Sequence, residues 1–154
     1  EPTAFGWAIA IICYPPINDV TGKILGWYSA DFSRFGSIDL SIFFGAIGIF
    51  LFVIYVWASV ALGAKASNLT NRGIVSSGPY RYVRHPSYMS KNLAWWVMGI
   101  PLIQSVGFLA VFSLVAWSLI YYMRALTEER HLMQDVEYVE YMKKVKYMFI
   151  PGVY

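Results

Sequence analysis

Long apolar runs separated by short polar segments dominate the chain. The longest uncharged run extends from Leu40 to Ala64, which exceeds the ~20 residues that a helix needs to cross a bilayer. A second apolar region, from Asn92 to Met123, is too long for one crossing and contains Pro101. We therefore expect a transmembrane helix over the first run and a helical hairpin over the second.

The hairpin is expected to begin at Pro86, because the missing N–H of a proline would have no partner in the first turn of a helix anyway. Its first arm should end near Ile103, and its second should start near Val106 and continue beyond Met123 into water. The first arm is short for a crossing, so part of it must lie among headgroups or be covered by protein. This hairpin returns the chain to the side on which it began.

Three shorter segments complete the pattern. Residues 4–13 are apolar but too short to cross a membrane, and residues 15–37 are typical of a linker with interfacial aromatic side chains. After Arg124, apolar residues recur at steps of three and four, which predicts an amphipathic helix that lies on the membrane or folds back over the polar loop. The recurring positions are Leu132, Val136, Val139, Met142 and Val145.

Charges are few and unevenly placed. The 154 residues are 58% apolar and 14% charged, and no acid occurs from Leu40 to Thr127. The apolar content excludes disorder, and a single cysteine excludes a disulfide scaffold. Although the net charge is +3, ten of the twelve Lys and Arg follow residue 64, beside apolar runs, so the charge indicates topology before nucleic-acid binding. Residues 65–91 and 124–154 are accordingly predicted to face the cytoplasm.

The fold predicted from these patterns is all-α. It is a polytopic, multi-pass membrane helix bundle with a transmembrane hairpin and a cytoplasmic amphipathic C-terminal helix. We expect residues 1–154 to form one integral membrane domain. Because the chain begins with Glu1 and has no leader of the secretory type, its start is expected to be truncated or processed.

The basic loop gathers many hydrogen-bonding groups between positions 80 and 88, namely Tyr80, Tyr82, Arg84, His85 and Tyr88. Ionisable groups beside a membrane are costly, so such a cluster is a candidate functional site. A loop that merely anchors the protein would explain Tyr82. It would not explain a histidine directly before a helix-starting proline.

The first acids after the acid-free stretch are Glu128 and Glu129, where the last apolar helix leaves the membrane. A surface pair between Glu128 and Arg124, one turn earlier, would contribute only ~0.3–0.5 kcal/mol. However, both acids are predicted to lie on the same side of the membrane as His85. Two acids facing a basic loop would form a site for a ligand that carries both charges.

These two motifs together resemble the isoprenylcysteine carboxyl methyltransferase family. The resemblance covers residues 70–151, about half the chain, with the motifs in order on either side of the hairpin. It rests on GPYRYVRHPSY at residues 78–88, and then on Glu128, Glu129, Leu132, Tyr138, Tyr141, Val145, Ile150 and Pro151. Two departures occur: Ser90, followed by Lys91, replaces the usual glycine, and Lys146 replaces a frequent proline.

Members of this family are integral membrane enzymes that use S-adenosylmethionine, and the phospholipid N-methyltransferases are among their relatives. The resemblance implies that an acid holds the cofactor's ammonium, His85 its carboxylate and aromatic side chains its adenine. The cofactor-binding residues so implied are Tyr80, His85, Pro86, Tyr88, Glu128, Glu129, Leu132, Tyr138 and Tyr141.

Two catalytic residues are predicted, Arg84 and Glu129. The planar fork of Arg84 matches a carboxylate, so we expect it to orient an acidic acceptor. If the acceptor were an amine, Glu129 would accept a proton and Arg84 would only balance charge.

The function implied is methyl transfer from S-adenosylmethionine to a lipophilic acceptor, foremost a carboxylate of the isoprenylcysteine type. Three alternatives remain: a phospholipid N-methyltransferase, a membrane reductase of the sterol-reductase type, and a non-catalytic membrane module. The expected partners are a lipophilic or prenylated acceptor and membrane lipids, and not nucleic acid. No metal is expected, because the two histidines and the single cysteine lack the spacing of a metal site.

Overall fold

The computed structural model describes residues 1–26, 34–67 and 69–153, and all the regular structure in them is helical. The predicted all-α fold is thereby confirmed. Besides two 3-10 turns, at Gly63–Lys65 and Gly78–Arg81, these residues form α1 (Ala4–Ile12), α2 (Ile17–Leu25), α3 (Ile38–Leu62), α4 (Pro86–Val106), α5 (Phe108–Leu132) and α6 (Val136–Lys144).

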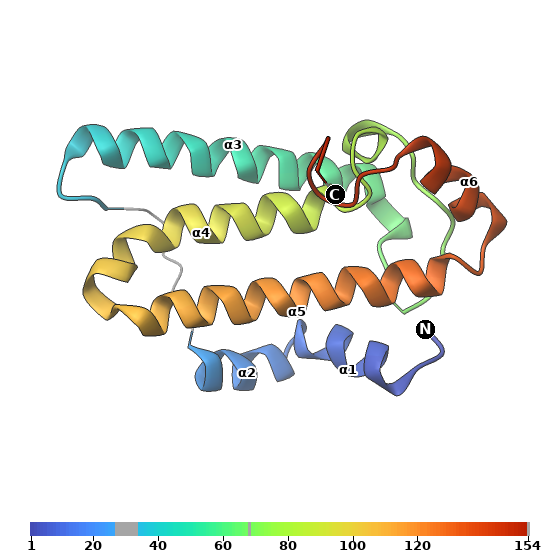
Figure 1. Ribbon diagram of the computed structural model, residues 1–154, viewed down its shortest axis with the longest axis horizontal. Helices are drawn as coiled ribbons and strands as arrows, with labels where there is room; N and C mark the ends of the chain where they lie inside the picture. The colour runs from blue at the N-terminus through green and yellow to red at the C-terminus, as the bar shows by residue number, and fades with distance from the viewer. Residues whose placement is uncertain (27–33, 68, 154) are drawn as a thin grey trace.

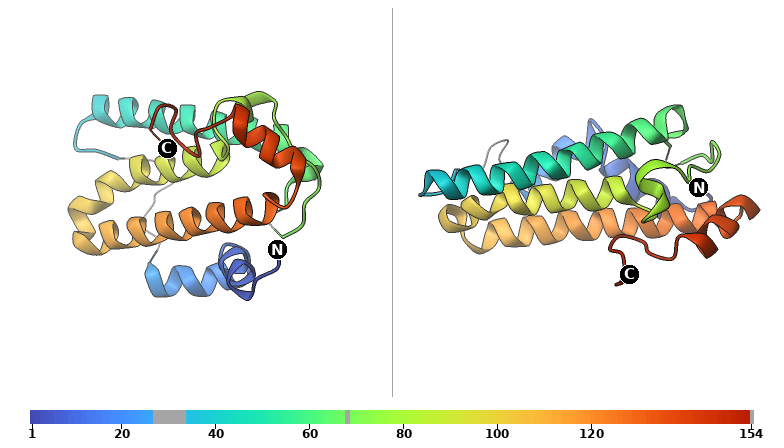
Figure 2. Two further views of the ribbon diagram at one scale, coloured as in Figure 1. Left: turned by 45° about the vertical axis from the view of Figure 1, so that its right-hand side comes forward. Right: turned by 90° about the horizontal axis from the view of Figure 1, so that it is seen from above.

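The three long helices lie side by side, with α4 between α3 and α5 (Figure 1). The short helices α1 and α2 follow one another along the outer side of α5. The turn between α4 and α5 lies at one end of the bundle, whereas α6 and the loop between α3 and α4 lie at the other (Figure 2). Segments that flank the hairpin in sequence therefore meet at one end of the molecule.

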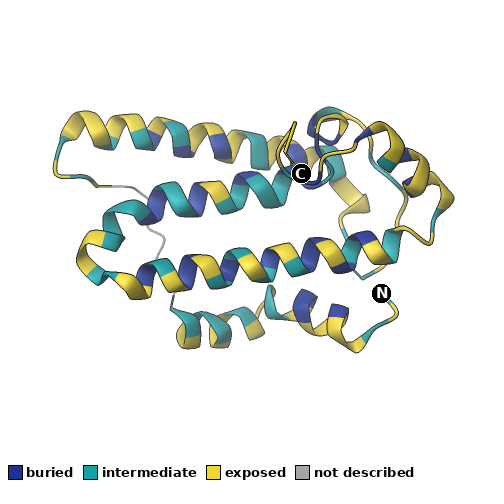
Figure 3. Cartoon of the chain, viewed as in Figure 1, coloured by how far each residue is buried: buried dark blue, intermediate teal, exposed yellow. Residues whose placement is uncertain are grey.

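Among the described residues, two helices are long and apolar enough to cross a membrane: α3, with the turn that follows it to Lys65, and α5. The outer face of α3 exposes large apolar side chains, among them Ile42, Phe50 and Val60 (Figure 3). Exposed apolar side chains along a helix of this length are compatible with lipid around it. On its inner face Gly48 is buried, and a Cβ atom there would overlap the Met98 methyl of α4.

The hairpin turns at Gly107 rather than between Ile103 and Val106. Pro101 lies inside α4, which continues to Val106. Gly107 has a φ of 71°, a conformation that glycine adopts without the steric cost of a side chain. The predicted start of the second arm near Val106 is therefore wrong by two residues, because the glycine and not the proline sets the turn.

The segment 15–37 is not a continuous linker, since α2 occupies its first half. The carbonyl of Gly26, which follows α2, accepts hydrogen bonds from Ser113 Oγ (2.8 Å) and Trp117 Nε1 (3.2 Å) of α5. These bonds attach α2 to the bundle, and no sequence pattern signals them. Three of the four aromatic residues predicted at the interface lie outside the described residues: Trp27, Tyr28 and Phe32.

The amphipathic C-terminal helix is confirmed, but it begins at Val136, because Leu132 still belongs to α5. Asp135 caps it by accepting a hydrogen bond from the backbone N–H of Glu137 (2.9 Å). After α6, the chain returns to the start of α4. There the backbone N–H groups of residues 84 and 85 donate to the carbonyls of residues 147 and 148, each over 3.0 Å.

Candidate active site

Three ionisable side chains at the polar end of the bundle satisfy one another, and we call them the paired cluster: Arg84, His85 and Glu129. Arg84 Nε donates to Glu129 Oε1 over 2.6 Å, and His85 Nε2 lies 3.2 Å from the same oxygen. The Arg84 and Glu129 side chains are 10% and 9% exposed. Burial at this level strengthens a paired charge and penalises an unpaired one.

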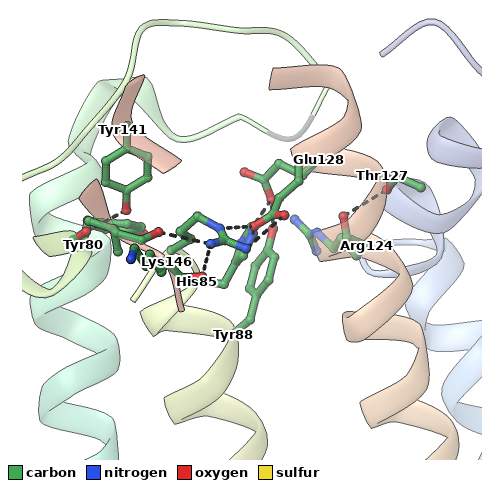
Figure 4. A network of polar contacts seen from close by, with 11 residues as sticks. Tyr80, His85, Tyr88, Arg124, Thr127, Glu128, Tyr141 and Lys146 are labelled. Carbon is green, nitrogen blue, oxygen red and sulfur yellow. Dashed lines mark hydrogen bonds and ion pairs between the residues drawn. The ribbon is translucent and has the colours of Figure 1, made fainter. Parts of the chain in front are cut away.

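Arg84 also binds the segment that follows α6. Its Nη1 donates to the carbonyls of Val145 (3.1 Å) and Lys146 (2.5 Å), as Figure 4 shows for Lys146. The contact with Lys146 uses the backbone, so it does not depend on the side chain at this position. The departure from the family's proline at Lys146 therefore leaves this closure of the site intact.

Glu128 has a different set of neighbours from Glu129. Tyr88 Oη donates to Glu128 Oε2 over 2.8 Å, and His85 Nδ1 lies 4.0 Å from that oxygen (Figure 4). The rings of His85 and Tyr88 stack, with centroids 5.3 Å apart. The structure thus brings the two sequence motifs together, as the prediction of a charged site between them required.

The surface pair between Glu128 and Arg124, which the sequence allowed as the alternative to a charged site, does not form among the described residues. Arg124 is only 6% exposed, and its Nη2 donates to Tyr14 Oη over 2.8 Å. The guanidinium carbon lies 4.9 Å from the centroid of the Tyr14 ring and 5.2 Å from that of Tyr88. Arg124 points into the bundle, toward α1 and α4, so a surface interpretation is wrong for it.

Two cavities adjoin these groups. A cofactor-side cavity of about 60 Å³ lies under the loop between α3 and α4 and against α6, and an inner cavity of about 220 Å³ reaches toward α1 and α5. Residues common to both linings are Leu62, Tyr80, Arg84, His85 and Glu128. A ligand that occupied both cavities would therefore pass directly over Glu128 and His85.

Most of the predicted site residues line one or both cavities. Leu132, Tyr138 and Tyr141 line the cofactor-side cavity, and Tyr88 lines the inner one. Pro86 and Glu129 are absent from the described linings of both. Pro86 is fully buried at the start of α4, and Glu129 lies behind Arg84 and His85. The structure therefore brings all the predicted residues to one end of the bundle but gives these two no face toward the cavities.

Buried tyrosines form one wall of the cofactor-side cavity. Burial raises the pKa of Tyr80 to about 12, and it also raises the pKa values of Tyr138 and Tyr141 above the ordinary range of a phenol. Tyr141 Oη donates to the Tyr80 carbonyl over 2.6 Å. These phenols remain neutral at physiological pH, and their rings offer flat surfaces for a planar ligand.

Two cations to which the sequence assigned no role in the site lie in aromatic surroundings, and we call them the caged cations: Lys91 and Arg124. Both face the Tyr121 ring, at 5.2 Å and 5.6 Å from its centroid, and both line the inner cavity. Neither forms an ion pair within the part of the chain that the structure describes. A sequence signal existed for them, because charges inside apolar helices mark functional positions.

The departure at Ser90 has a simple local role. Ser90 is completely buried, and its Oγ donates to the carbonyl of Pro86 over 2.8 Å. A residue larger than serine would not fit this interior position without displacing its neighbours. Ser90 therefore preserves the close packing that a glycine would allow.

Fold and site together define a helical membrane protein with a buried ionic site at one end of its bundle. A sequence model of the "Isoprenylcysteine carboxyl methyltransferase (ICMT) family" matches residues 40–134, which include all but the first two residues of α3, the basic loop, the hairpin and both acids. The chain therefore belongs to the isoprenylcysteine carboxyl methyltransferase family, as the two motifs indicated.

A curated relative supports this membership. The protein-S-isoprenylcysteine O-methyltransferase of Saccharomyces cerevisiae is 32% identical over 84 residues. The aligned region covers 53% of this chain and 34% of the yeast protein. The chain thus corresponds to about a third of that relative's length.

Proposed function

We propose that this protein is a membrane-embedded methyltransferase that transfers a methyl group from S-adenosylmethionine to a lipophilic acid. The observation that carries the proposal is the arrangement of Glu128 between His85 and Tyr88, at the junction of two cavities that run from the polar end of the bundle into its interior. Membership of the methyltransferase family supports the reaction class. Neither the family match nor the relative favours a reductase or a non-catalytic module.

The chemistry of the lining suits S-adenosylmethionine. The cofactor's ammonium requires an anion, which Glu128 supplies, and its carboxylate requires donors, which His85 and the loop N–H groups supply. Its adenine requires a flat wall, which Tyr138 and Tyr141 supply beside Leu132. When bound, the cofactor provides an electrophilic methyl group on a sulfonium.

The residues of this chain would contribute orientation and a dry environment rather than a covalent intermediate. Glu128, oriented by the Tyr88 hydroxyl, would fix one end of the cofactor, and the buried tyrosines would exclude water. Methylation of a carboxylate removes one negative and one positive charge, so a water-poor site favours it. Holding acceptor and methyl donor in line accounts for most of the remaining rate enhancement.

Arg124 is the residue that we propose to orient the acceptor. Its Nε is buried without a hydrogen-bond partner among the described residues, although the side chain lines the inner cavity. A carboxylate at this point would give the nitrogen a partner and neutralise the guanidinium. A protonated amine would instead meet two cations, so an aminophospholipid is the less suitable acceptor.

Arg84 and Glu129, predicted from the sequence to act on the acceptor, have a different part in this proposal. Arg84 would have to release Glu129 before its fork could hold an acceptor carboxylate. We therefore propose both as positioning residues, which hold His85 and the segment after α6 in place.

We further propose that the protein is multi-pass and that residues 65–91 and 124–154 face the cytoplasm. The excess of Lys and Arg over acids in the first of these segments supports this orientation. A water-soluble cofactor would then enter from the cytoplasm, and a lipophilic acceptor from the bilayer.

The experiment that tests the cofactor site is titration calorimetry of S-adenosylhomocysteine into the protein in neutral detergent. We expect the parent to bind and Glu128→Gln to bind at least tenfold more weakly, because a charge-assisted contact is lost. Glu140→Gln, at an exposed position of α6, serves as the matched control and should bind like the parent. A folded parent that did not bind would refute the proposal.

The acceptor class is tested separately. Methylation of N-acetyl-S-farnesylcysteine should be measured beside that of phosphatidylethanolamine with the same enzyme preparation. We expect the carboxylate to be methylated and the amine not to be. Methylation of the amine alone would show that Arg124 does not select the acceptor as proposed.

A further inference from the structure

A third cavity, of about 790 Å³, adjoins the inner cavity and lies between α2, α4 and α5, and we call it the lateral cavity. The inner and lateral cavities share Cys13, Lys91 and Tyr121. Lys91 therefore lies at the junction of a small cavity that reaches Glu128 and a larger one that extends along the bundle. An acceptor that reached the site through the lateral cavity would pass this ammonium group.

The walls of the lateral cavity are amphiphilic. Trp95 and Trp117 supply apolar indole rings, whereas α2 supplies Asn18, Asp19 and Lys23. Asp19 and Lys23 carry opposite charges one helical turn apart and therefore neutralise each other. The net positive charge of the lining comes from Lys91. Asn18 Oδ1 is buried without a hydrogen-bond partner in the described residues. Such a lining is suited to a molecule with polar groups beside its apolar part, more than to a hydrocarbon chain alone.

Lys91 is held by aromatic groups, and no anion pairs with it in the described residues. Its Nζ donates to Tyr121 Oη over 3.0 Å and lies 5.1 Å from the centroid of the Trp95 ring and 5.8 Å from that of Tyr55. Aromatic faces attract a cation without neutralising its charge. Because Arg124 faces the same Tyr121 ring, two like charges share this region, and an anion between or beside them would relieve their repulsion.

We propose that Lys91 is a specificity-determining residue that binds a second oxyanion of the acceptor, distinct from the group that receives the methyl. This inference rests on the proposed function and adds to it. Arg124 holds the methyl-accepting acid, and Lys91 holds a phosphate or carboxylate further along the same molecule. The indole walls require that the oxyanion belong to a membrane amphiphile, rather than arrive as a free ion from water.

The test measures binding of dodecyl phosphate to the full chain in neutral maltoside detergent, by quenching of tryptophan fluorescence. Dodecanoate, dodecanol and inorganic phosphate are titrated in parallel. We expect both charged amphiphiles to bind at least tenfold more tightly than dodecanol, since a hydrogen bond to a charged group is worth roughly that factor. Inorganic phosphate should not bind.

Three substitutions at Lys91 separate charge from structure. Lys91→Met should lower the affinity for dodecyl phosphate at least tenfold, and Lys91→Gln, which keeps a donor for Tyr121, should do the same. Lys91→Arg should retain affinity close to that of the parent. Lys146→Met removes an exposed cation that lines none of the three cavities, and it should change nothing.

S-adenosylhomocysteine is titrated into the same preparations to keep this inference separate from the proposed function. Retained cofactor affinity in Lys91→Met, with loss of dodecyl phosphate affinity, supports the inference. Equal binding of dodecyl phosphate to the parent, Lys91→Met and Lys91→Gln overturns it, and so does inorganic phosphate binding as tightly as the amphiphile. If no preparation bound S-adenosylhomocysteine, the proposed function would fail instead. The dodecyl phosphate titrations would still test the role proposed for Lys91.

Discussion

The paired cluster and the caged cations both lie in the polar half of the bundle and are buried or half-buried, yet their charges are satisfied in opposite ways. In the paired cluster, Arg84 and His85 converge on one carboxylate of Glu129. Around the caged cations, rings and hydroxyls take the place of carboxylates. α5 contributes to both, through Arg124 and through Glu129 little more than one turn later.

The difference separates a carboxylate that maintains the site, Glu129, from two cations that can bind an anionic acceptor, Arg124 and Lys91. A buried charge with a good partner gains little from a ligand and loses much if its partner is removed. A buried charge surrounded by aromatic rings still attracts an anion. Arg84 and His85 line both cavities, but Glu129, the carboxylate that pairs with them, lies outside both linings, whereas Arg124 and Lys91 line the inner cavity.

Removal of Glu129 should have the largest effect, because it leaves Arg84 buried without its carboxylate. We expect Glu129→Ala to lower the free energy of unfolding by about 3–5 kcal/mol. Thermal unfolding in detergent, followed by near-UV circular dichroism, measures the loss. Glu140→Ala, which breaks an exposed pair with Lys143, is the control and should leave stability close to that of the parent, because exposed pairs contribute little.

The same prediction can be sharpened with a second substitution. If Arg84→Met is added to Glu129→Ala, part of the lost stability should return, because no unpaired charge is then buried. Strictly additive losses would contradict the idea that these two residues act mainly on each other.

Replacement of Arg124 should affect the acceptor rather than the fold. We expect Arg124→Met to lower kcat/KM for N-acetyl-S-farnesylcysteine about thirty- to hundredfold, equivalent to about 2–3 kcal/mol. S-adenosylhomocysteine should bind it as it binds the parent. Arg130→Met, at a more exposed position of α5, is the matched control. A variant that lost cofactor affinity as strongly as acceptor turnover would place Arg124 with the paired cluster instead.

Alkaline pH tests whether the cavity wall beside the paired cluster is dry. A phenol ionises near pH 10 in the unfolded chain, but burial raises the pKa of Tyr80 to about 12 in the folded protein. Stability should therefore be unaffected by Tyr80 below pH 10 and should fall between pH 10 and 12, by about 1 kcal/mol at pH 11. Chemical denaturation at pH 8 and pH 11 measures this loss of stability in the parent and in Tyr80→Phe. The parent should lose more than the variant, and the two losses would be equal if water reached the phenol.

The smallest effect is expected where the two groups of charge meet, at Tyr88. Tyr88→Phe removes the hydroxyl that orients Glu128 and should weaken S-adenosylhomocysteine binding about fivefold, or about 1 kcal/mol. Calorimetry measures the change, and Tyr82→Phe, at an exposed position of the loop before α4, should bind like the parent. Unchanged affinity in Tyr88→Phe would mean that Glu128 needs no such orientation.

Much of the fold could be predicted because its dominant elements are long and apolar. The crossing helix and the hairpin follow from two uncharged runs, and the predicted ends of the crossing helix differ from those of α3 by only two residues. α2 escaped prediction because it is short and buries none of its residues completely. Its place depends on the Gly26 carbonyl and its contacts with Ser113 and Trp117, which are far away in the sequence.

The sequence indicated which residues form the site but not which of them face the cavities. Neighbouring residues of a helix point about 100° apart, so one of Glu128 and Glu129 had to face the cavity and the other away from it. Which one does so depends on how α5 is rotated against α4, and no local pattern records that rotation. Lys91 was noted only as the residue after the departure at Ser90, and it is the packing of α4 beside Tyr121 that suggests a role for it.

The backbone hydrogen bonds between residues 84–85 and 147–148 set an order of events during synthesis. A chain leaves the ribosome from its N-terminus, so α3 and the start of α4 emerge before Glu129 and the segment after α6 have been made. During that interval the Arg84 guanidinium has none of its final partners and must stay hydrated. Insertion of the helices therefore comes first, and the site is completed late, once Glu129 and the segment after α6 have been made.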